Sequence, residues 1–233
     1  MRRRLYLLAM ILFIFATLIT TVFVASFNPR YYTKMYDELA VSETIGVSDE
    51  ELKDVTITLF RYIKGKQPSL DHEVTINGQR VEMFNEREKA HMVDVKNLYL
   101  KARFIRDISM IFVAVMLVIS LGTGDYLDYN LNKKIVKESL LIVSVVIITV
   151  GVMAVLDFTT FWITFHKLVF TNDLWLLDPA TDRMISMVPE PVFMGLVYRI
   201  LVMVLAEFAV LTLAYFGLDW MDKKNDSRRT ISA

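Results

Sequence analysis

The sequence predicts an all-α polytopic membrane protein with four transmembrane helices and a small α+β extracytoplasmic domain. Of its 233 residues, 55% are hydrophobic, a higher share than soluble domains usually reach. Four long runs carry few or no charges, and about 20 such helical residues cross a hydrocarbon core of about 30 Å. A lipid bilayer is therefore the expected environment.

The four apolar runs define the expected spans, at residues 5–27, 108–121, 139–156 and 192–218. The first run is longer than the apolar part of a cleaved signal peptide, which usually has about 7–15 residues, so an uncleaved span is favoured. The second run is short, and its helix must include residues before Ile108 to cross the membrane. The fourth run is long and begins just after a proline-flanked turn.

The distribution of basic residues predicts the orientation, because Lys and Arg collect in short cytoplasmic segments. They lie at the N-terminus, between spans two and three, and in the tail with Arg228 and Arg229, whereas the segment between spans three and four has only Lys167 and Arg183. We therefore expect a multi-pass protein of the cell membrane with both termini in the cytoplasm. The predicted division is 1–27 for the N-terminal arginines and span one, 28–107 for an extracytoplasmic domain and the helix carrying His91, 108–121 for span two, 122–138 for a cytoplasmic loop, 139–156 for span three, 157–191 for an extracytoplasmic interfacial segment carrying His166, 192–218 for span four and 219–233 for a cytoplasmic tail.

Composition also excludes several kinds of function. The chain has no cysteine, which removes disulfides, thiolate metal sites and thiol nucleophiles. Its formal net charge is zero and it has no basic stripe with interleaved aromatics, so no nucleic-acid partner is expected.

The first outer segment carries local signals of a folded domain. Ser48 and Glu51 form a capping-box pattern before a helix expected to reach about Lys64. Asn77-Gly78 lies between two short alternating stretches and predicts a type I′ hairpin.

A second capping-box pattern, Asn85 with Glu88, predicts a helix that runs toward span two, since no Gly or Pro follows until Gly122. At about 100° per residue, one apolar stripe of this helix contains His91, Val95, Leu98, Ala102 and Ile105. His91 therefore lies on the apolar face with Asp94 one turn away. The simplest interpretation is a core imidazole that bonds to a nearby carboxylate.

After span three, aromatic residues at helical spacing predict a helix at the membrane interface that carries His166; they are Phe158, Phe161, Trp162 and Phe165. A turn-rich stretch follows, containing Asn172, Asp173, Trp175 and Asp178. By residue type alone, the aromatics are typical lipid anchors and the aspartates typical turn formers.

Two stretches resemble the bacterial lipoprotein intramolecular transacylase (Lit) family. They are FNEREKAHMVDVK at residues 84–96 and FHKLVFTNDLWLLDPATD at residues 165–182, with Pro189-Glu190 after them. The order of four spans with one long and one short outer segment is also the family's arrangement. The resemblance implies a membrane acyltransferase whose partners are diacylglyceryl lipoproteins and membrane lipid. The reaction that it implies needs neither a cofactor nor a metal.

In this family one acyl chain moves from the sn-2 glycerol oxygen to the α-amine of the lipoprotein's N-terminal cysteine, giving the lyso form. The resemblance assigns the two catalytic histidines to His91 and His166. Further residues match the motifs without an assigned role: Arg87, Asp94, Asn172, Asp173, Trp175 and Asp178. Arg199, inside span four at outer-leaflet depth, is an additional candidate to contact substrate.

The chemistry of these residues suits the implied reaction. An α-amine has a pKa of about 7.7–8.0 and needs a base near neutrality, the departing alkoxide needs an acid, and histidine suits either task. Asp94 or Asp173 is expected to fix a histidine tautomer, and Asn172 or a backbone amide to stabilise the oxyanion. No serine lies in a Gly-x-Ser-x-Gly pattern, so direct transfer is expected, with Thr164 or Thr171 as the competing nucleophile.

Two other function classes stay open from sequence. A metal-dependent membrane hydrolase has candidate ligands in His91, Asp94, His166 and Asp173. A transporter or non-catalytic subunit is suggested by Arg199 and Glu207, since ionisable residues inside spans are costly and usually functional; at eight residues apart they cannot pair directly.

Overall fold

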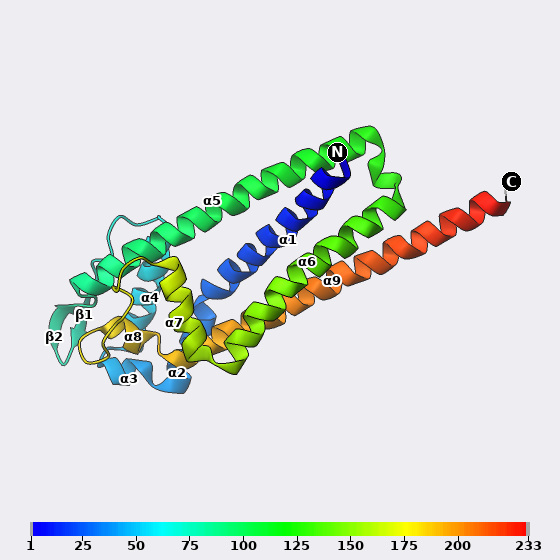
Figure 1. Cartoon of the computed structure of the whole chain (residues 1–233). Coiled ribbons are helices and arrows are strands. Elements are labelled where there is room, and N and C mark those ends of the chain that lie inside the picture. Colours follow the sequence, from blue (N-terminus) through cyan, green and yellow to red (C-terminus); the bar gives the residue numbers. More distant parts are fainter. Residues whose placement is uncertain (1, 232–233) are drawn as a thin grey trace. The chain divides into compact units, whose positions relative to one another are not determined.

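The computed structural model of the chain describes residues 2–231, without the side chains of residues 225, 226 and 228–231 (Figure 1). The ends of the predicted segments 1–27 and 219–233, and the side chains of Arg228 and Arg229, lie outside the described part. The chain folds into two compact units. The helical unit comprises Met1–Val22, Phe104–Leu156 and Ile200–Ala233, and the head unit comprises Phe23–Arg103 and Asp157–Arg199.

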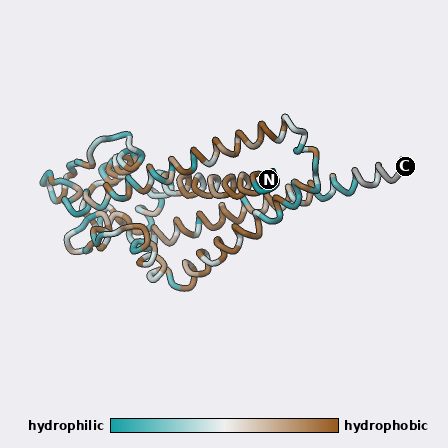
Figure 2. The backbone as a smooth tube through the Cα atoms, turned by 45° about the horizontal axis from the view of Figure 1, so that its top comes forward, coloured by the Kyte–Doolittle hydropathy of each residue, from teal (hydrophilic) through white to brown (hydrophobic). Residues whose placement is uncertain are grey.

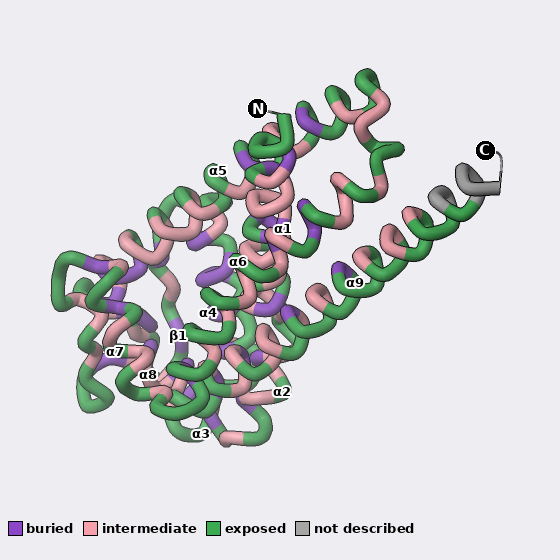
Figure 3. Tube along the Cα trace, turned by 45° about the vertical axis from the view of Figure 1, so that its right-hand side comes forward, coloured by how far each residue is buried: buried purple, intermediate pink, exposed green. Residues whose placement is uncertain are grey.

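Four helices are long and apolar enough to cross a membrane, as the sequence predicts. They are α1 (Arg2–Ser26), α5 (Glu86–Thr123), α6 (Tyr129–Leu156) and α9 (Glu190–Ile231), of which Glu190–Lys224 is the apolar candidate. The hydropathy colouring of Figure 2 shows the long apolar stretches of these helices. Only 11–17% of each most apolar window is buried within the chain, so most of this surface needs lipid to cover it (Figure 3).

Two predicted boundaries differ from the structure. The loop expected at 122–138 is mostly helical, because after a short 3₁₀ turn, η1 (Asp125–Leu127), α6 already begins at Tyr129. The tail expected after Leu218 continues α9 to Ile231. In both places polar residues extend a helix whose apolar part alone was visible in the hydropathy pattern, since no Pro interrupts them.

Polar contacts join helices within the helical unit. Lys133 of α6 donates to both Asp219 and Asp222 of α9, each at 2.9 Å. Tyr6 of α1 donates to Asp125 at 2.7 Å. These contacts explain why the charged segment after span two is ordered as helix.

The head unit contains the expected small α+β fold. Its remaining elements are α2 (Pro29–Leu39), α3 (Val41–Ile45), α4 (Asp49–Ile63), β1 (Glu73–Ile76), β2 (Gln79–Glu82), α7 (Phe158–Val169) and α8 (Arg183–Met187). The capping box of α4 is confirmed, because the Ser48 hydroxyl accepts from the Glu51 amide and the Glu51 carboxylate accepts from the Ser48 amide.

The predicted hairpin is also confirmed. Strands β1 and β2 pair antiparallel, with Ile76 opposite Gln79. The two turn residues, Asn77 and Gly78, have φ of 53° and 79°, the left-handed values that a type I′ turn requires at both central positions.

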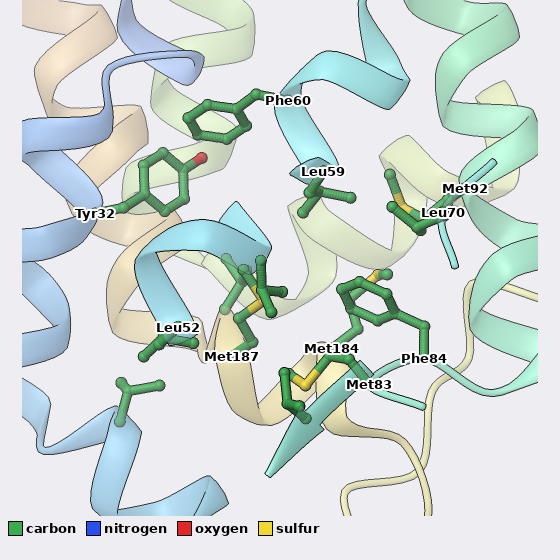
Figure 4. Close-up of a cluster of buried hydrophobic side chains, with 14 of the residues drawn as sticks. Tyr32, Leu52, Leu59, Phe60, Leu70, Met83, Phe84, Met92, Met184 and Met187 are labelled. Atoms are coloured by element: carbon green, nitrogen blue, oxygen red, sulfur yellow. The ribbon is translucent and has the colours of Figure 1, made fainter. Parts of the chain in front are cut away.

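Buried apolar side chains from both chain segments of the head unit form one core (Figure 4). Leu52 comes from α4, Phe84 precedes α5, Met92 lies on α5, and Met187 belongs to α8. Each such side chain contributes about 1.5–3 kcal/mol when fully buried. These two segments are therefore one folded body, which holds the first part of α5 and α7 in a fixed relation.

Candidate functional site

The two candidate histidines lie together in the head unit although they come from different helices. His91 on α5 and His166 on α7 have ring centroids 6.3 Å apart, with their planes inclined by 37°. They are only 7% and 6% exposed. Both rings are thus close enough to act on neighbouring atoms of one bound molecule.

Aromatic rings surround His166. The centroid of Trp162, one turn before it on α7, lies at 4.3 Å, and those of Trp175, Phe165 and Phe170 lie at 5.0, 5.3 and 5.6 Å. Phe170 also contacts His91 edge-on at 5.3 Å. Two of the aromatics expected as lipid anchors, Trp162 and Phe165, therefore form an apolar wall beside the histidine pair together with Phe170 and Trp175.

The hydrogen bonding of His166 defines its tautomer. Its Nδ1 lies 2.8 Å from the carbonyl oxygen of Trp162, which can only accept, so Nδ1 carries the hydrogen. In the neutral ring Nε2 then holds the lone pair. Burial lowers the pKa of His166, against the opposing effect of the carbonyl hydrogen bond, and favours this neutral form.

His91 differs from His166 in its bonding. Its Nδ1 is buried and has no hydrogen-bond partner among the described residues. The interpretation of His91 as a core imidazole bonded to a carboxylate is therefore wrong in this structure. A buried polar atom without a partner costs free energy, and such atoms are frequent where a ligand supplies the missing partner.

Several motif residues attach the loop after α7 to α5. Asn172 donates its amide to the Asp94 carboxylate at 2.8 Å, and Arg87 donates to the carbonyl oxygens of Asp173 and Leu176 at 2.5 and 3.3 Å. Neither Asp94 nor Asp173 fixes the tautomer of His166, since the carbonyl of Trp162 does so. The Asn172 side chain donates to Asp94 and accepts from the Leu174 amide at 3.0 Å, so its contacts order the loop and do not support the expected oxyanion role.

A buried acidic network continues these attachments, and sequence reasoning did not single it out as part of the site. The Glu88 carboxylate, 1% exposed, accepts from the backbone amides of Asn85 at 2.7 Å and Met184 at 2.5 Å. Asp182 accepts from the Asn85 side chain and from the Asp178 amide, both at 2.7 Å. The capping pattern at Asn85 was the available signal, but it did not reveal these long-range partners.

The hydrogen bonds of Asp182 also determine its charge. Burial alone acts to raise the pKa of this carboxyl group, but the amide of Asp178 and the side chain of Asn85 outweigh it and lower the pKa. Asp182 is therefore ionised at neutral pH. Asp178 has a turn-forming role, because its carboxylate accepts from the Ala180 amide at 2.9 Å.

One further candidate, Arg199, lies beside Tyr31. The guanidinium carbon of Arg199 is 5.8 Å from the centroid of Tyr31, whose hydroxyl donates to the Val192 carbonyl at 2.6 Å. The described residues include no group of three or more His, Asp or Glu placed to hold a metal ion. The four metal ligands expected by the hydrolase alternative are therefore not gathered into one site.

Comparison with known proteins identifies a family and solved structures that resemble this chain. The chain matches the family described as lipoprotein intramolecular transacylase Lit over residues 7–193. The solved structure of the membrane-integral lipoprotein intramolecular transacylase Lit from Bacillus cereus superposes with a TM-score of 0.78 and 21% identity, covering 96% of this chain and 98% of that chain. No curated protein matches the chain.

Two altered forms of the same Bacillus cereus protein, in which one histidine is replaced by arginine or alanine, give TM-scores of 0.72 and 0.73 at 22% and 20% identity. They cover 97% and 96% of this chain and 95% and 96% of theirs. With the four apolar helices, the shared fold makes this chain a multi-pass membrane protein. Since the family match spans most of its length, the chain belongs to the lipoprotein intramolecular transacylase family.

Proposed function

We propose that this protein is an acyltransferase that moves the sn-2 acyl chain of a diacylglyceryl lipoprotein to the α-amine of its N-terminal cysteine. The product is the N-acyl S-monoacylglyceryl lyso form. Family membership supports the substrate class. The observation that carries the chemistry is the pair of buried imidazoles, His91 and His166, with ring centroids 6.3 Å apart.

The tautomer of His166 supports its assignment as the base. Its Nε2 lone pair accepts a proton from the attacking amine, and the resulting imidazolium donates that proton to the departing glycerol oxygen. A bond forms between the amine nitrogen and the acyl carbonyl carbon, and the bond between that carbon and the sn-2 oxygen breaks. His166 therefore takes up one proton and releases it again within one turnover. The carbonyl of Trp162 stabilises the imidazolium formed in between.

In this proposal His91 stabilises the negative charge that develops on the carbonyl oxygen. No carboxylate bonds to its ring among the described residues, so it acts as a neutral imidazole whose N–H donates to the oxygen that becomes negative in the tetrahedral intermediate. The apolar wall around both rings excludes water, which strengthens that hydrogen bond and prevents hydrolysis of the ester.

Acyl transfer is expected to proceed directly, without an acyl-enzyme. Amine and ester belong to one substrate molecule, and holding them in a reactive geometry contributes about 7–11 kcal/mol. The competing nucleophiles are Thr164 and Thr171, of which Thr171 is exposed. Incubating the protein with a lipoprotein carrying a labelled sn-2 chain, amid unlabelled lipid, should leave all label in the same lipoprotein by mass spectrometry. A labelled threonine peptide, or exchange with bulk lipid, would overturn the direct route.

The orientation and the division into segments predicted from sequence are part of this proposal, with the bounds of α6 and α9 taken from the structure and the histidine pair on the extracellular face. Because the chain has no cysteine, single-cysteine variants report sidedness cleanly. Ser69→Cys and Thr181→Cys, both exposed, should react with an impermeant maleimide on intact cells. Ser227→Cys should react only after permeabilisation, and its labelling from outside would reverse the orientation.

Arg199 and Glu207 are expected to differ in their effect on activity. The Glu207 carboxylate already accepts from the hydroxyls of Thr17 and Thr21, so Glu207→Gln keeps an acceptor there and should change turnover little. Among the described residues Arg199 contacts only the ring of Tyr31, and we place it at outer-leaflet depth, so Arg199→Leu should raise the KM for lipoprotein several-fold. Equal loss of protein yield for both variants would indicate a purely structural role.

A further inference from the structure

A group of basic side chains in the head unit has no acidic partner. Lys64 and Lys66 follow α4, and Lys96 lies on α5; none of the three forms an ion pair within the described residues. We call them the interfacial lysine cluster. The two segments that carry them touch, since the side chain of Leu100 lies 3.6 Å from the Cβ position at Gly65.

Aromatic rings hold two of these ammonium groups in place. The Lys64 nitrogen lies 4.3 Å from the centroid of Phe27, and the Lys96 nitrogen lies 4.4 Å from that of Tyr62. Such contacts stabilise a cation without neutralising its charge. Lys64 and Lys96 are therefore positioned with their charges available to an external anion.

The depth of the cluster along the helices corresponds to the headgroup layer. Phe27 directly follows the end of α1 at Ser26, and its ring packs against Tyr99 of α5 at 5.2 Å. The apolar run from Ile108 is too short to cross alone, so its span includes about six preceding residues and the hydrocarbon edge falls near Arg103. At about 1.5 Å per residue, Lys96 lies roughly 10 Å outside that edge, within side-chain reach of lipid phosphates.

Mutual repulsion within the cluster adds support. Burial, and after it the nearby positive charge of Lys66, lowers the pKa of Lys64. No acidic side chain opposes this effect. A bound anion would relieve both the repulsion and the cost of burying an unpaired ammonium group.

We propose that Lys64, Lys66 and Lys96 form a binding site for the phosphate headgroup of an anionic phospholipid of the outer leaflet, separate from the histidine pair. Charge complementarity and headgroup depth favour a lipid over a soluble anion or an acidic peptide. Such a lipid would fasten the end of α4 to the entry of α5 into the membrane. The choice of leaflet rests on the proposed orientation, whereas the lipid binding itself does not depend on the acyl-transfer reaction.

Native mass spectrometry of the full chain in detergent tests this site. With equal phosphatidylglycerol and phosphatidylcholine added, the wild type should retain phosphatidylglycerol preferentially. Lys64→Gln/Lys66→Gln/Lys96→Gln should weaken that retention roughly tenfold to a hundredfold, because each basic residue near a membrane surface attracts anionic lipid. The matched control Lys34→Gln/Lys53→Gln/Arg80→Gln removes the same charge from exposed positions of the head unit and should retain the wild-type preference.

Two further arms make the outcome decisive. Lys64→Arg/Lys66→Arg/Lys96→Arg keeps the charge and the ring contacts and should bind phosphatidylglycerol like the wild type. Lys66 is exposed and has no ring contact, so Lys66→Gln alone should fold and still test the site if the triple Gln variant does not fold. Millimolar inorganic phosphate should not displace the lipid. Equal retention of both lipids by the wild type, or displacement by free phosphate, would each overturn the lipid assignment.

Discussion

Replacing His166 with alanine is expected to lower the rate of lyso-form production by about 10²–10⁴-fold, the usual contribution of one positioned acid–base group. The substitution removes the Nε2 lone pair, for which no other described side chain substitutes, while the aromatic wall and the core of the head unit remain. The variant should therefore be produced and inserted normally. Product formation from a purified diacylglyceryl lipoprotein, measured by mass spectrometry in detergent, gives the rate.

His91→Ala should cause a loss of similar scale, because one oxyanion donor contributes about 10²–10³-fold. The double variant should be little slower than either single variant, since both rings act on one transition state. His72 is the control, because it lies in the same head unit, 3.7 Å from the Asp54 carboxylate, and belongs to neither histidine motif; His72→Ala should keep near-wild-type activity. Near-normal activity of His91→Ala would remove that residue from the mechanism.

The pH dependence of the wild-type rate follows from the environment of His166. Burial lowers the pKa of this imidazole, so the base form already predominates above its folded pKa and is not limiting near neutrality. The substrate amine, with a pKa of about 7.7–8.0, is then the group that must lose a proton. The rate should rise through that range and level off above it.

Signals confined to neighbouring residues predicted the local structure well. The capping box at Ser48, the hairpin at Asn77-Gly78 and the second capping box at Asn85 were all confirmed, because each depends on bonds within a few residues. The four apolar helices were equally visible, since a bilayer imposes its thickness on the sequence. Helix ends were less predictable where polar residues simply continue a helix, as before Ser139 in α6.

Long-range partners could not be predicted in the same way. Family resemblance indicated His91 and His166, but residue spacing carries no information that their rings meet. The bond between Asn172 and Asp94 and the packing of Trp175 on His166 depend on how the loop after α7 lies against α5. That placement is a property of the assembled core, which no local pattern encodes.

Glu88 is expected to be the residue of this region whose loss most reduces stability. Its buried carboxylate accepts from the amides of Asn85 and Met184, and so connects the start of α5 to the start of α8. Glu88→Ala leaves both amides without an acceptor, at about 1–3 kcal/mol each, so the free energy of unfolding should fall by roughly 2–6 kcal/mol. Glu86→Ala is the matched control, because Glu86 occupies the same first turn but is fully exposed and only approaches Lys89, at 3.6 Å.

Glu88→Gln separates packing from charge in this network. Glutamine keeps the volume and one acceptor oxygen and is itself accepted in a capping box, so the loss should be intermediate. Thermal unfolding followed in detergent should rank the midpoints as wild type and Glu86→Ala highest, Glu88→Gln lower and Glu88→Ala lowest, by about 2–4 °C per kcal/mol. If Glu88→Ala unfolded at the wild-type midpoint, the network would not be what holds the α8 end against α5, and the spacing of the two histidines would depend on the Arg87 and Asn172 contacts instead.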